Sequence, residues 1–200
     1  MYNIYLFIAF QNAYDSIHRD MLWKCMEEFK ILTKLINRCK TCVQKTRSAV
    51  RIEETLSSFF ENKTGLKQGD PLSPILFNLS LQKVIQSIKM FSSSIKISKE
   101  QLNILAYADV IILIGKNEVE IRKLFVEMEN VAWKLGLQVN QEKTKYIIVE
   151  RKNILKQNKI GHFKIKVYKF ERVENFKFLG VIISEDNNYQ IDLQERIKKH

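Results

Sequence analysis

The sequence predicts an α+β domain, and three observations lead to this fold class. Apolar runs typical of strands alternate with amphipathic segments of helical spacing along the 200 residues. Two of the strand-like runs, residues 104–107 and 110–114, flank a two-residue turn, which indicates antiparallel pairing. Hydrophobic residues make up 46% of the chain and charged residues 28%, with only 6 Gly and 2 Pro. This composition allows a sizeable core and excludes collagen-like, low-complexity and wholly disordered chains.

Each expected element has its own signal. The first residues are apolar and aromatic without helical spacing, which predicts a buried strand; capping residues and apolar repeats then mark the helices. In the first half we expect a strand at 2–10, a helix at 17–30 capped by Ser16, a helix at 32–42, a hairpin from 49–52 and 56–60, a loop at 64–74, and a helix capped by Ser73 that runs to Lys89. In the second half we expect the 104–114 hairpin, a helix at 118–135 ended by Gly136, strands at 146–149, 163–167 and 176–183, and a terminal helix at 191–199.

The cysteine residues and the hydropathy of the chain indicate the cellular compartment in which it is expected. The chain has 3 Cys, an odd number, so a disulfide framework is not expected. Cys39 and Cys42 form a C-x-x-C without a second pair, and neither His162 nor His200 completes a metal set. No apolar run reaches the roughly 18 residues of a membrane span, and the N-terminus lacks a basic leader. We expect an intracellular protein, in the cytoplasm or nucleus, without a membrane partner.

The charge balance points to a polyanionic partner. Lys and Arg number 33 against 22 Asp and Glu, a net charge of +11. Residues 151–177 hold nine of these cations against two Glu, interleaved with aromatic residues. The candidate contacts to a nucleic-acid backbone are Arg151, Lys152, Lys164, Lys166 and Lys169. The charge by itself suits nucleic acid or an anionic membrane, of which we expect nucleic acid, and a lysine-rich solvated surface explains the same charge and stays open.

Five segments follow one another in the order of a known pattern. They read LFIAFQNAYD at 6–15, GLKQGDPLSP at 65–74, AYADV at 106–110, GLQVNQEKTK at 136–145 and FKFLG at 176–180. In these segments the chain resembles the palm of reverse transcriptases from non-long-terminal-repeat retrotransposons, the jockey-like kind in particular. The resemblance runs from about residue 4 to residue 184, and the second segment is the most specific of the five.

The resemblance implies a fold and an ancestral activity. The fold is a polymerase palm, a ferredoxin-like antiparallel sheet with helices on one face, over residues 1–184. Residues 185–200 would form a terminal helix that starts a thumb or connection region. The fingers and most of the thumb would be missing from this chain. The implied activity is RNA-directed DNA polymerisation with two Mg²⁺ or Mn²⁺ ions, and the implied partner is RNA or DNA, bound without sequence preference and without an obligate protein partner.

The metal ligands depart from the family pattern. Ala9 stands where the family has Asp, and Val110 stands at the second position of its Asp-Asp pair. Asp109 remains as the candidate catalytic and metal-binding carboxylate, because methyl and isopropyl groups cannot ligate a hard cation. Asp15 matches a separate family residue and replaces neither. We therefore expect a catalytically inactive relative of the polymerase; a non-enzymatic basic nucleic-acid-binding module and a non-functional relic of the element stay open.

The remaining site residues are carried over from the resemblance. Lys143 matches a catalytic lysine near the pyrophosphate, as proton donor or electrostatic stabiliser. The implied nucleotide-binding residues are Phe10, Tyr14, Gln68 and Gly69, and the implied primer grip is Phe178, Leu179 and Gly180. Each has a purely structural alternative: a core tyrosine, a plain loop before a helix, a surface lysine or a core aromatic.

Overall fold

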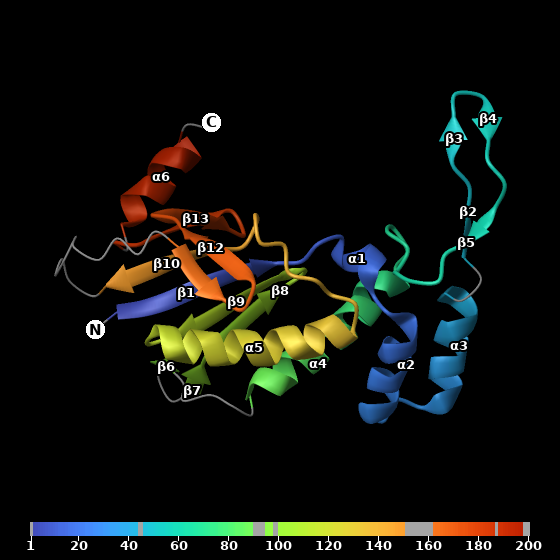
Figure 1. Cartoon of the computed structure of the whole chain (residues 1–200), viewed down its shortest axis with the longest axis horizontal. Coiled ribbons are helices and arrows are strands. Elements are labelled where there is room, and N and C mark those ends of the chain that lie inside the picture. The colour runs from blue at the N-terminus through green and yellow to red at the C-terminus, as the bar shows by residue number, and fades with distance from the viewer. Residues whose placement is uncertain are drawn as a thin grey trace. The chain divides into compact units, whose positions relative to one another are not determined.

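Four antiparallel strands form the centre of the fold. The computed structural model describes residues 2–43, 46–89, 95–97, 100–150, 162–186 and 188–197. The central strands are β1 (Tyr2–Ala9), β8 (Ile104–Tyr107), β9 (Val110–Gly115) and β10 (Lys145–Glu150). They lie in the order β10-β1-β9-β8 (Figure 1). With α4 (Leu72–Lys89) before β8 and α5 (Glu118–Lys134) between β9 and β10, this is the ferredoxin-like arrangement that the resemblance implies.

A second hairpin extends the sheet beyond β10. It consists of β11 (His162–Ile165) and β12 (Tyr168–Arg172), and β12 pairs with β10 in parallel. The sequence predicts one strand at 163–167 and misses β12, because the turn at Lys166 and Val167 contains no Gly or Pro. Lys166 adopts a positive φ of 50° there, a conformation that Gly, Asn or Asp usually marks in the sequence of a hairpin turn.

β1 is buried on both of its faces. Leu6 and Ile8 are buried and point to the face that α5 covers. On this face the rings of Phe125 in α5 and Phe170 pack edge to face, with their centroids 5.2 Å apart. Phe7 points to the opposite face and stacks on Phe176 at 4.1 Å. Phe176 belongs to the hairpin of β13 (Asn175–Phe178) and β14 (Val181–Ser184). The expectation of helices on one face is correct for α5, and this hairpin covers the other face.

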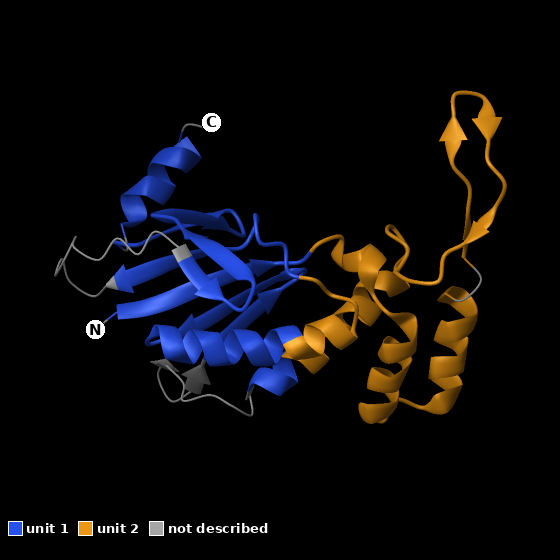
Figure 2. Ribbon diagram, viewed as in Figure 1, with its two compact units in different colours: residues 1–10, 85–129, 139–200 blue, residues 11–84, 130–138 orange. Residues whose placement is uncertain are grey.

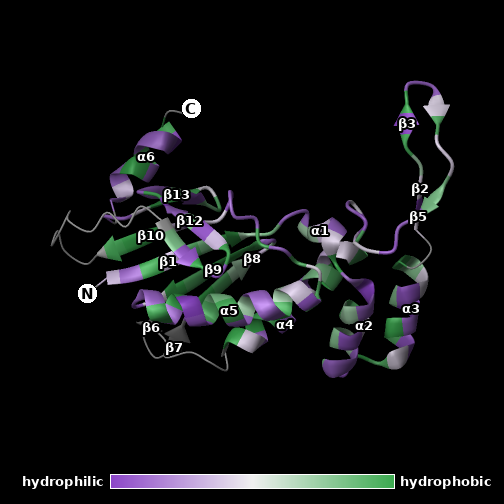
Figure 3. Ribbon diagram, viewed as in Figure 1, coloured by the Kyte–Doolittle hydropathy of each residue, from purple (hydrophilic) through white to green (hydrophobic). Residues whose placement is uncertain are grey.

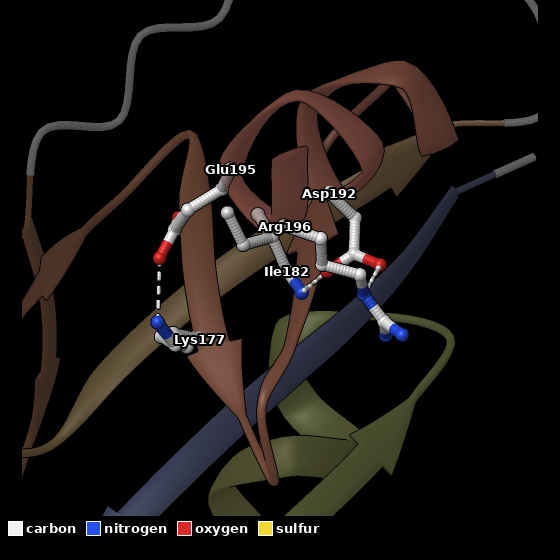
Figure 4. Close-up of polar contacts among 5 residues, drawn as sticks. All are labelled: Lys177, Ile182, Asp192, Glu195 and Arg196. Atoms are coloured by element: carbon white, nitrogen blue, oxygen red, sulfur yellow. Dashed lines mark hydrogen bonds and ion pairs between the residues drawn. The ribbon is translucent and has the colours of Figure 1, made fainter. Parts of the chain in front are cut away.

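The terminal helix α6 (Tyr189–Ile197) is joined to the β13–β14 hairpin by polar contacts (Figure 4). The Asp192 carboxylate accepts a hydrogen bond from the Ile182 backbone N–H at 2.8 Å and pairs with Arg196 Nε at 2.8 Å. Lys177 of β13 pairs with Glu195. The helix begins two residues before the predicted start, because the Asn188 side chain accepts the Gln190 N–H and so caps the first turn.

The chain divides into two compact units (Figure 2), residues 1–10, 85–129 and 139–200, and residues 11–84 and 130–138. Among the described residues, the second unit holds three whole helices, four two-residue strands, and the parts of α4 and α5 at residues 72–84 and 130–134. The helices are α1 (Ala13–Ser16), α2 (Arg19–Glu28) and α3 (Thr33–Val43); the strands are β2 (Arg47–Ser48), β3 (Arg51–Ile52), β4 (Thr55–Leu56) and β5 (Phe60–Glu61). These strands form a projecting arm, with β2 and β5 at its base and β3 and β4 at its tip.

Two predicted helix caps are wrong. Ser16 ends α1 instead of starting a longer helix: its hydroxyl donates to the Ala13 carbonyl at 3.2 Å, and Ile17 then turns to an extended conformation. Ser73 lies inside α4, because the Asp70 carboxylate accepts the Leu72 N–H at 2.8 Å and starts the helix earlier. Gly136 ends α5 as predicted, with a φ of 87°.

The remaining described strands pair only with each other. β6 (Ile95–Ile97) and β7 (Glu100–Leu102) form a separate two-stranded ribbon. Hydrophobic colour concentrates on the central strands, whereas the helices alternate between apolar and polar residues (Figure 3). Among the described helices, none combines the length and the apolar character needed to cross a membrane.

We expect Asp192→Ala to loosen α6 from β14. A hydrogen bond to a charged group contributes about 2 kcal/mol, so hydrogen exchange of the Ile182 amide should accelerate by about 30-fold. The matched control is Glu195→Ala, which removes the exposed ion pair with Lys177 and should change this exchange by less than about fivefold. Equal acceleration in the two variants would show that the Asp192 contact does not hold the helix.

Candidate functional site

The ends of β1 and β9 bring the predicted metal-site positions together. Ala9, the last residue of β1, is the register partner of Val110, the first residue of β9. Directly opposite residues of antiparallel strands point to the same face. Asp109 precedes Val110 in the two-residue turn from β8, in which Ala108 takes a φ of 49°. Ala9 and Asp109 therefore lie close together, and the Asp109 side chain is exposed to solvent at this strand end.

A turn at residues 140–143 holds the end of β1. The Asn140 N–H donates to the Ala9 carbonyl at 2.8 Å, and the Ala9 N–H donates to Thr144 Oγ1 at 3.3 Å. Thr144 is fully buried. The Asn140 side chain also accepts the Lys143 N–H at 3.1 Å, so the backbone of Lys143 is fixed in the turn that holds Ala9. The lysine side chain itself is exposed.

The tight turn between β13 and β14 belongs to the same unit. It consists of Leu179 and Gly180, with φ of 51° and 81°. Both are positive, as a two-residue hairpin turn requires. Phe178, just before the turn, lies with its ring centroid 6.3 Å from that of Phe7, two residues before Ala9 on the same strand. Leu179 is 57% exposed, so its apolar side chain is presented to solvent at the tip of the turn.

In the second unit, the loop of residues 64–74 is hydrogen-bonded to the segment that contains α1. The Gly65 N–H donates to the Ile17 carbonyl and the Leu66 N–H to the Tyr14 carbonyl, both at 2.8 Å. The Tyr14 ring stacks on Phe77 of α4 with centroids 4.6 Å apart. The Tyr14 backbone thus lies against the start of the loop that continues to Gln68 and Gly69, both of which are exposed.

This arrangement matches a known family. The family model described as reverse transcriptase (RNA-dependent DNA polymerase) matches residues 1–183. The chain belongs to the reverse transcriptase family. Among curated proteins it is similar to the Pol polyprotein of the type-1 retrotransposable element R2 of Nasonia vitripennis, 19% identical over 92% of this chain and 18% of that protein. It is also similar to the R2DM polyprotein of Drosophila melanogaster, 20% identical over 84% of this chain and 16% of that protein.

Solved structures of telomerase share the fold. Apo telomerase from Candida tropicalis, truncated from its C-terminal domain, matches with a TM-score of 0.64 and 20% identity. The match covers 92% of this chain and 34% of that one. Telomerase of the same organism in complex with a fragment of telomeric RNA matches with a TM-score of 0.65 and 18% identity, over 94% of this chain and 30% of that one. The reverse transcriptase domain described here therefore has a polymerase palm fold, and it spans about a fifth of the length of its retrotransposon relatives and a third of the telomerases.

The donor atoms at the β1–β9 end do not fit a pair of Mg²⁺ ions. Such ions need oxygen ligands, with carboxylates that bridge them. Asp109 supplies one carboxylate, and the side chains of Ala9 and Val110 supply no ligand atom. Within the described ranges, no three His, Cys, Asp or Glu side chains lie together as a metal cluster would require. No reaction step through a metal follows from these residues.

Arg19 holds the base of the arm against the loop, a role that its sequence context alone does not predict. Its side chain is 7% exposed, and its guanidinium donates to the carbonyls of Gly65 at 2.8 Å and Asn62 at 2.7 Å. Burial lowers the pKa of the Arg19 guanidinium, and nearby Glu61 opposes that shift. One signal could have revealed Arg19: it shares the core-facing side of α2 with three buried residues, Leu22, Trp23 and Met26.

The remaining residues predicted to contact nucleotide or nucleic acid differ in exposure and in ion pairing. Phe10 is 4% exposed, so its ring belongs to the core. Arg151 and Lys152 lie outside the described residues. Lys164 and Lys169 are exposed on β11 and β12, whereas Lys166 pairs with Glu129. Ion pairs also join neighbouring cations to acids of the same unit: Lys145 to Glu171, Arg172 to Glu185 and Lys177 to Glu195. These carboxylates offset part of the positive charge from which the binding segment was predicted.

We expect Gly65→Ala to destabilise the reverse transcriptase domain far more than Gly69→Ala. Both glycines have a left-handed φ, 80° and 84°, which costs an alanine about 1 kcal/mol. A Cβ on Gly65 would also lie 2.6 Å from the Asp15 carbonyl oxygen, whereas one on Gly69 would meet nothing within 4 Å. Gly65→Ala should therefore lose a further 1–3 kcal/mol or more, roughly, in the free energy of unfolding measured with urea. Equal losses would mean that the loop does not pack on the α1 segment.

Proposed function

We propose that this chain is the palm of a jockey-like, non-long-terminal-repeat reverse transcriptase that binds RNA or DNA without sequence preference and does not polymerise. The observation that carries the proposal is the register of Ala9 against Val110 beside Asp109. These are the three positions at which the resemblance places the metal-binding carboxylates. Only one of them keeps an oxygen ligand.

The size of the catalytic loss follows from the chemistry of the metals. Two ions activate the primer hydroxyl and stabilise charge that develops on the leaving pyrophosphate. Removal of a bridging carboxylate weakens this stabilisation when it matters most, in the transition state. A loss of about 10³-fold corresponds to roughly 4 kcal/mol on the barrier. Because two of the three ligand positions have no side-chain oxygen, we infer that the polymerase is inactive.

The charge of the chain supports the binding part of the proposal. A net charge of +11 attracts a polyanion over a long range, and neutralisation of phosphates releases counterions irrespective of base sequence. Binding should therefore be sensitive to salt and indifferent to sequence. One telomerase of similar fold was solved in complex with a fragment of telomeric RNA, and a nucleic-acid ligand is in keeping with that neighbour.

Two measurements on the purified full chain test the proposal together. Binding of fluorescently labelled RNA and DNA oligonucleotides of two unrelated sequences is measured at ~50 and ~200 mM salt, and extension of a primed RNA template is measured with Mg²⁺ and with Mn²⁺. We expect salt-sensitive binding that falls at least about tenfold between the two salt concentrations, with no extension. Template-dependent extension would overturn the proposed inactivity, and absence of binding would overturn the binding module.

We expect the double substitution Ala9→Asp with Val110→Asp to create metal-dependent stability. The new carboxylates would repel Asp109 and each other without metal, so the melting temperature of the metal-free protein should fall. A site with a Kd of ~2 mM would gain about 1 kcal/mol at ~10 mM Mg²⁺, which for a chain of this size corresponds to about 2–4 °C.

The matched control is Ala9→Asn with Val110→Asn, which has nearly the same shape but no charge. Neither this variant nor the parent should show a comparable shift with Mg²⁺. An equal response in the Asp and Asn variants would show that the two positions do not converge on one metal site, and the assignment of their roles would fail.

A further inference from the structure

One stretch of the chain is basic and contains no acidic residue. Residues 29–52 include seven Lys or Arg and not one Asp or Glu. In the structure this stretch runs from the end of α2 through α3 and along the first side of the arm, all within the second unit. The base of the arm lies near the C-terminal end of α3 (Figure 1). Acidic residues flank this stretch at both ends, at Glu27, Glu28, Glu53 and Glu54, so ion pairing in the structure decides which of its cations stay free.

Four of these cations are exposed and form no ion pair with any described residue. Lys34 and Arg38 lie one turn apart on α3, and Arg47 and Arg51 lie on β2 and β3. Within the part of the chain that the structure describes, none of the four lies within ion-pair distance of a carboxylate. This holds even for Arg47, which is the register partner of Glu61. Arg51 donates only to the Glu53 carbonyl, at 3.1 Å.

The spacing on α3 also favours an anionic ligand. Like charges four residues apart on a helix repel each other and destabilise the helix slightly. A phosphate between Lys34 and Arg38 would turn this repulsion into attraction. In the first unit, by contrast, Lys166, Arg172 and Lys177 have carboxylate partners.

The returning side of the arm exposes aromatic rings. Phe59 is 72% exposed and Phe60 is 49% exposed. Along the arm, apolar and polar residues alternate (Figure 3). Exposed rings beside cations are the combination that holds single strands, because bases stack on the rings while phosphates contact the cations. A hollow of about 630 Å³ lies at the foot of the arm and is lined by Arg47, Lys63 and Lys67, together with the carboxylates Asp15 and Glu61.

We propose that α3 and the arm form a binding surface for single-stranded nucleic acid, made of Lys34, Arg38, Arg47, Arg51, Phe59 and Phe60. We refer to these six residues as the arm surface. The proposal rests on the nucleic-acid binding proposed above and adds to it where the strand lies. The four cations contact phosphates, and the two phenylalanines stack on unpaired bases. The surface discriminates single strands from duplexes, because the bases of a duplex are not free to stack on side chains.

The decisive experiment compares two quadruple variants of the full chain. One carries Lys34→Gln, Arg38→Gln, Arg47→Gln and Arg51→Gln. The other carries Lys116→Gln, Lys123→Gln, Lys177→Gln and Arg196→Gln, which removes the same charge from exposed positions of the first unit that are not among the predicted backbone contacts. Affinity for a labelled 20-nucleotide single strand of mixed sequence is measured between ~50 and ~200 mM salt, and melting curves check that both variants fold.

We expect the first variant to lose at least about tenfold in affinity at ~0.1 M salt and the salt slope to fall by up to roughly 3, since each phosphate contact on a single strand contributes about 0.7 to the slope. The second variant should lose less than about threefold. Equal losses in the two variants, or a larger loss in the second, would overturn the arm surface while leaving the proposed function intact. No binding by the parent protein would overturn the proposed function itself.

A second pair of variants tests the rings independently of charge. Phe59→Ala with Phe60→Ala should weaken single-strand binding by about fivefold or more and leave binding of a 20-base-pair duplex unchanged. The control is Val50→Ala with Ile52→Ala, which removes exposed apolar side chains of the same arm that cannot stack on bases. If the parent binds vesicles with anionic lipids more tightly than the single strand, and the phenylalanine variant loses that binding, the ligand is a membrane surface and the proposal is wrong. Self-association that disappears in the phenylalanine variant, without any change in strand binding, would equally exclude it.

Discussion

The two-sided pairing of β1 is the constraint on which the first unit depends. From Ile4 to Ala9 the strand pairs with β9, and from Tyr2 to Phe7 it pairs with β10. Side chains on both faces of the strand are buried. A slip of one residue in the pairing would therefore exchange the side chains that face α5 with those that face the β13–β14 hairpin. The register places Ala9 opposite Val110 as a geometric consequence. The positions of the candidate site are therefore a result of core packing, irrespective of which side chains occupy them.

This separation explains how a palm can keep its fold with a changed site. The positions at issue lie at a strand end and a turn, where Asp109 is exposed and Ala9 is only partly buried. Three carboxylates at one strand end would repel one another, so apolar replacements cost the folded state little or stabilise it. The buried residues of β1 have the opposite character, because truncation of Leu6 or Phe7 would open a cavity. Stability and metal binding thus depend on different residues of the same strand.

Much of the central sheet could be predicted from sequence, because its signals are local. The strand-turn-strand at 104–114 and the helix ended by Gly136 occur as predicted, since hydrophobic periodicity and glycine conformation are determined within a few residues. The break between α1 and α2 could not be predicted, because Ile17 is extended to accept a hydrogen bond from Gly65, far along the chain. The structural role of Arg19 could not be predicted for a related reason, because its hydrogen-bond partners, Asn62 and Gly65, lie more than 40 residues away in the sequence.

The basic surface of the chain is also difficult to predict from a count of charged residues in the sequence. A count over residues 151–177 includes only two acidic residues, yet Glu129 and Glu185, which pair with cations of that segment, lie outside it in the sequence. A window of sequence measures the charge of a segment, whereas a polyanion meets the charge of a surface. The two agree only where neither the segment nor its neighbours in space offer a carboxylate within reach. Among the described residues, Lys34 and Arg38 meet this condition more fully than the paired cations Arg172 and Lys177, although net charge alone treats all four alike. A basic protein surface is therefore best located by asking which cations remain unpaired after folding.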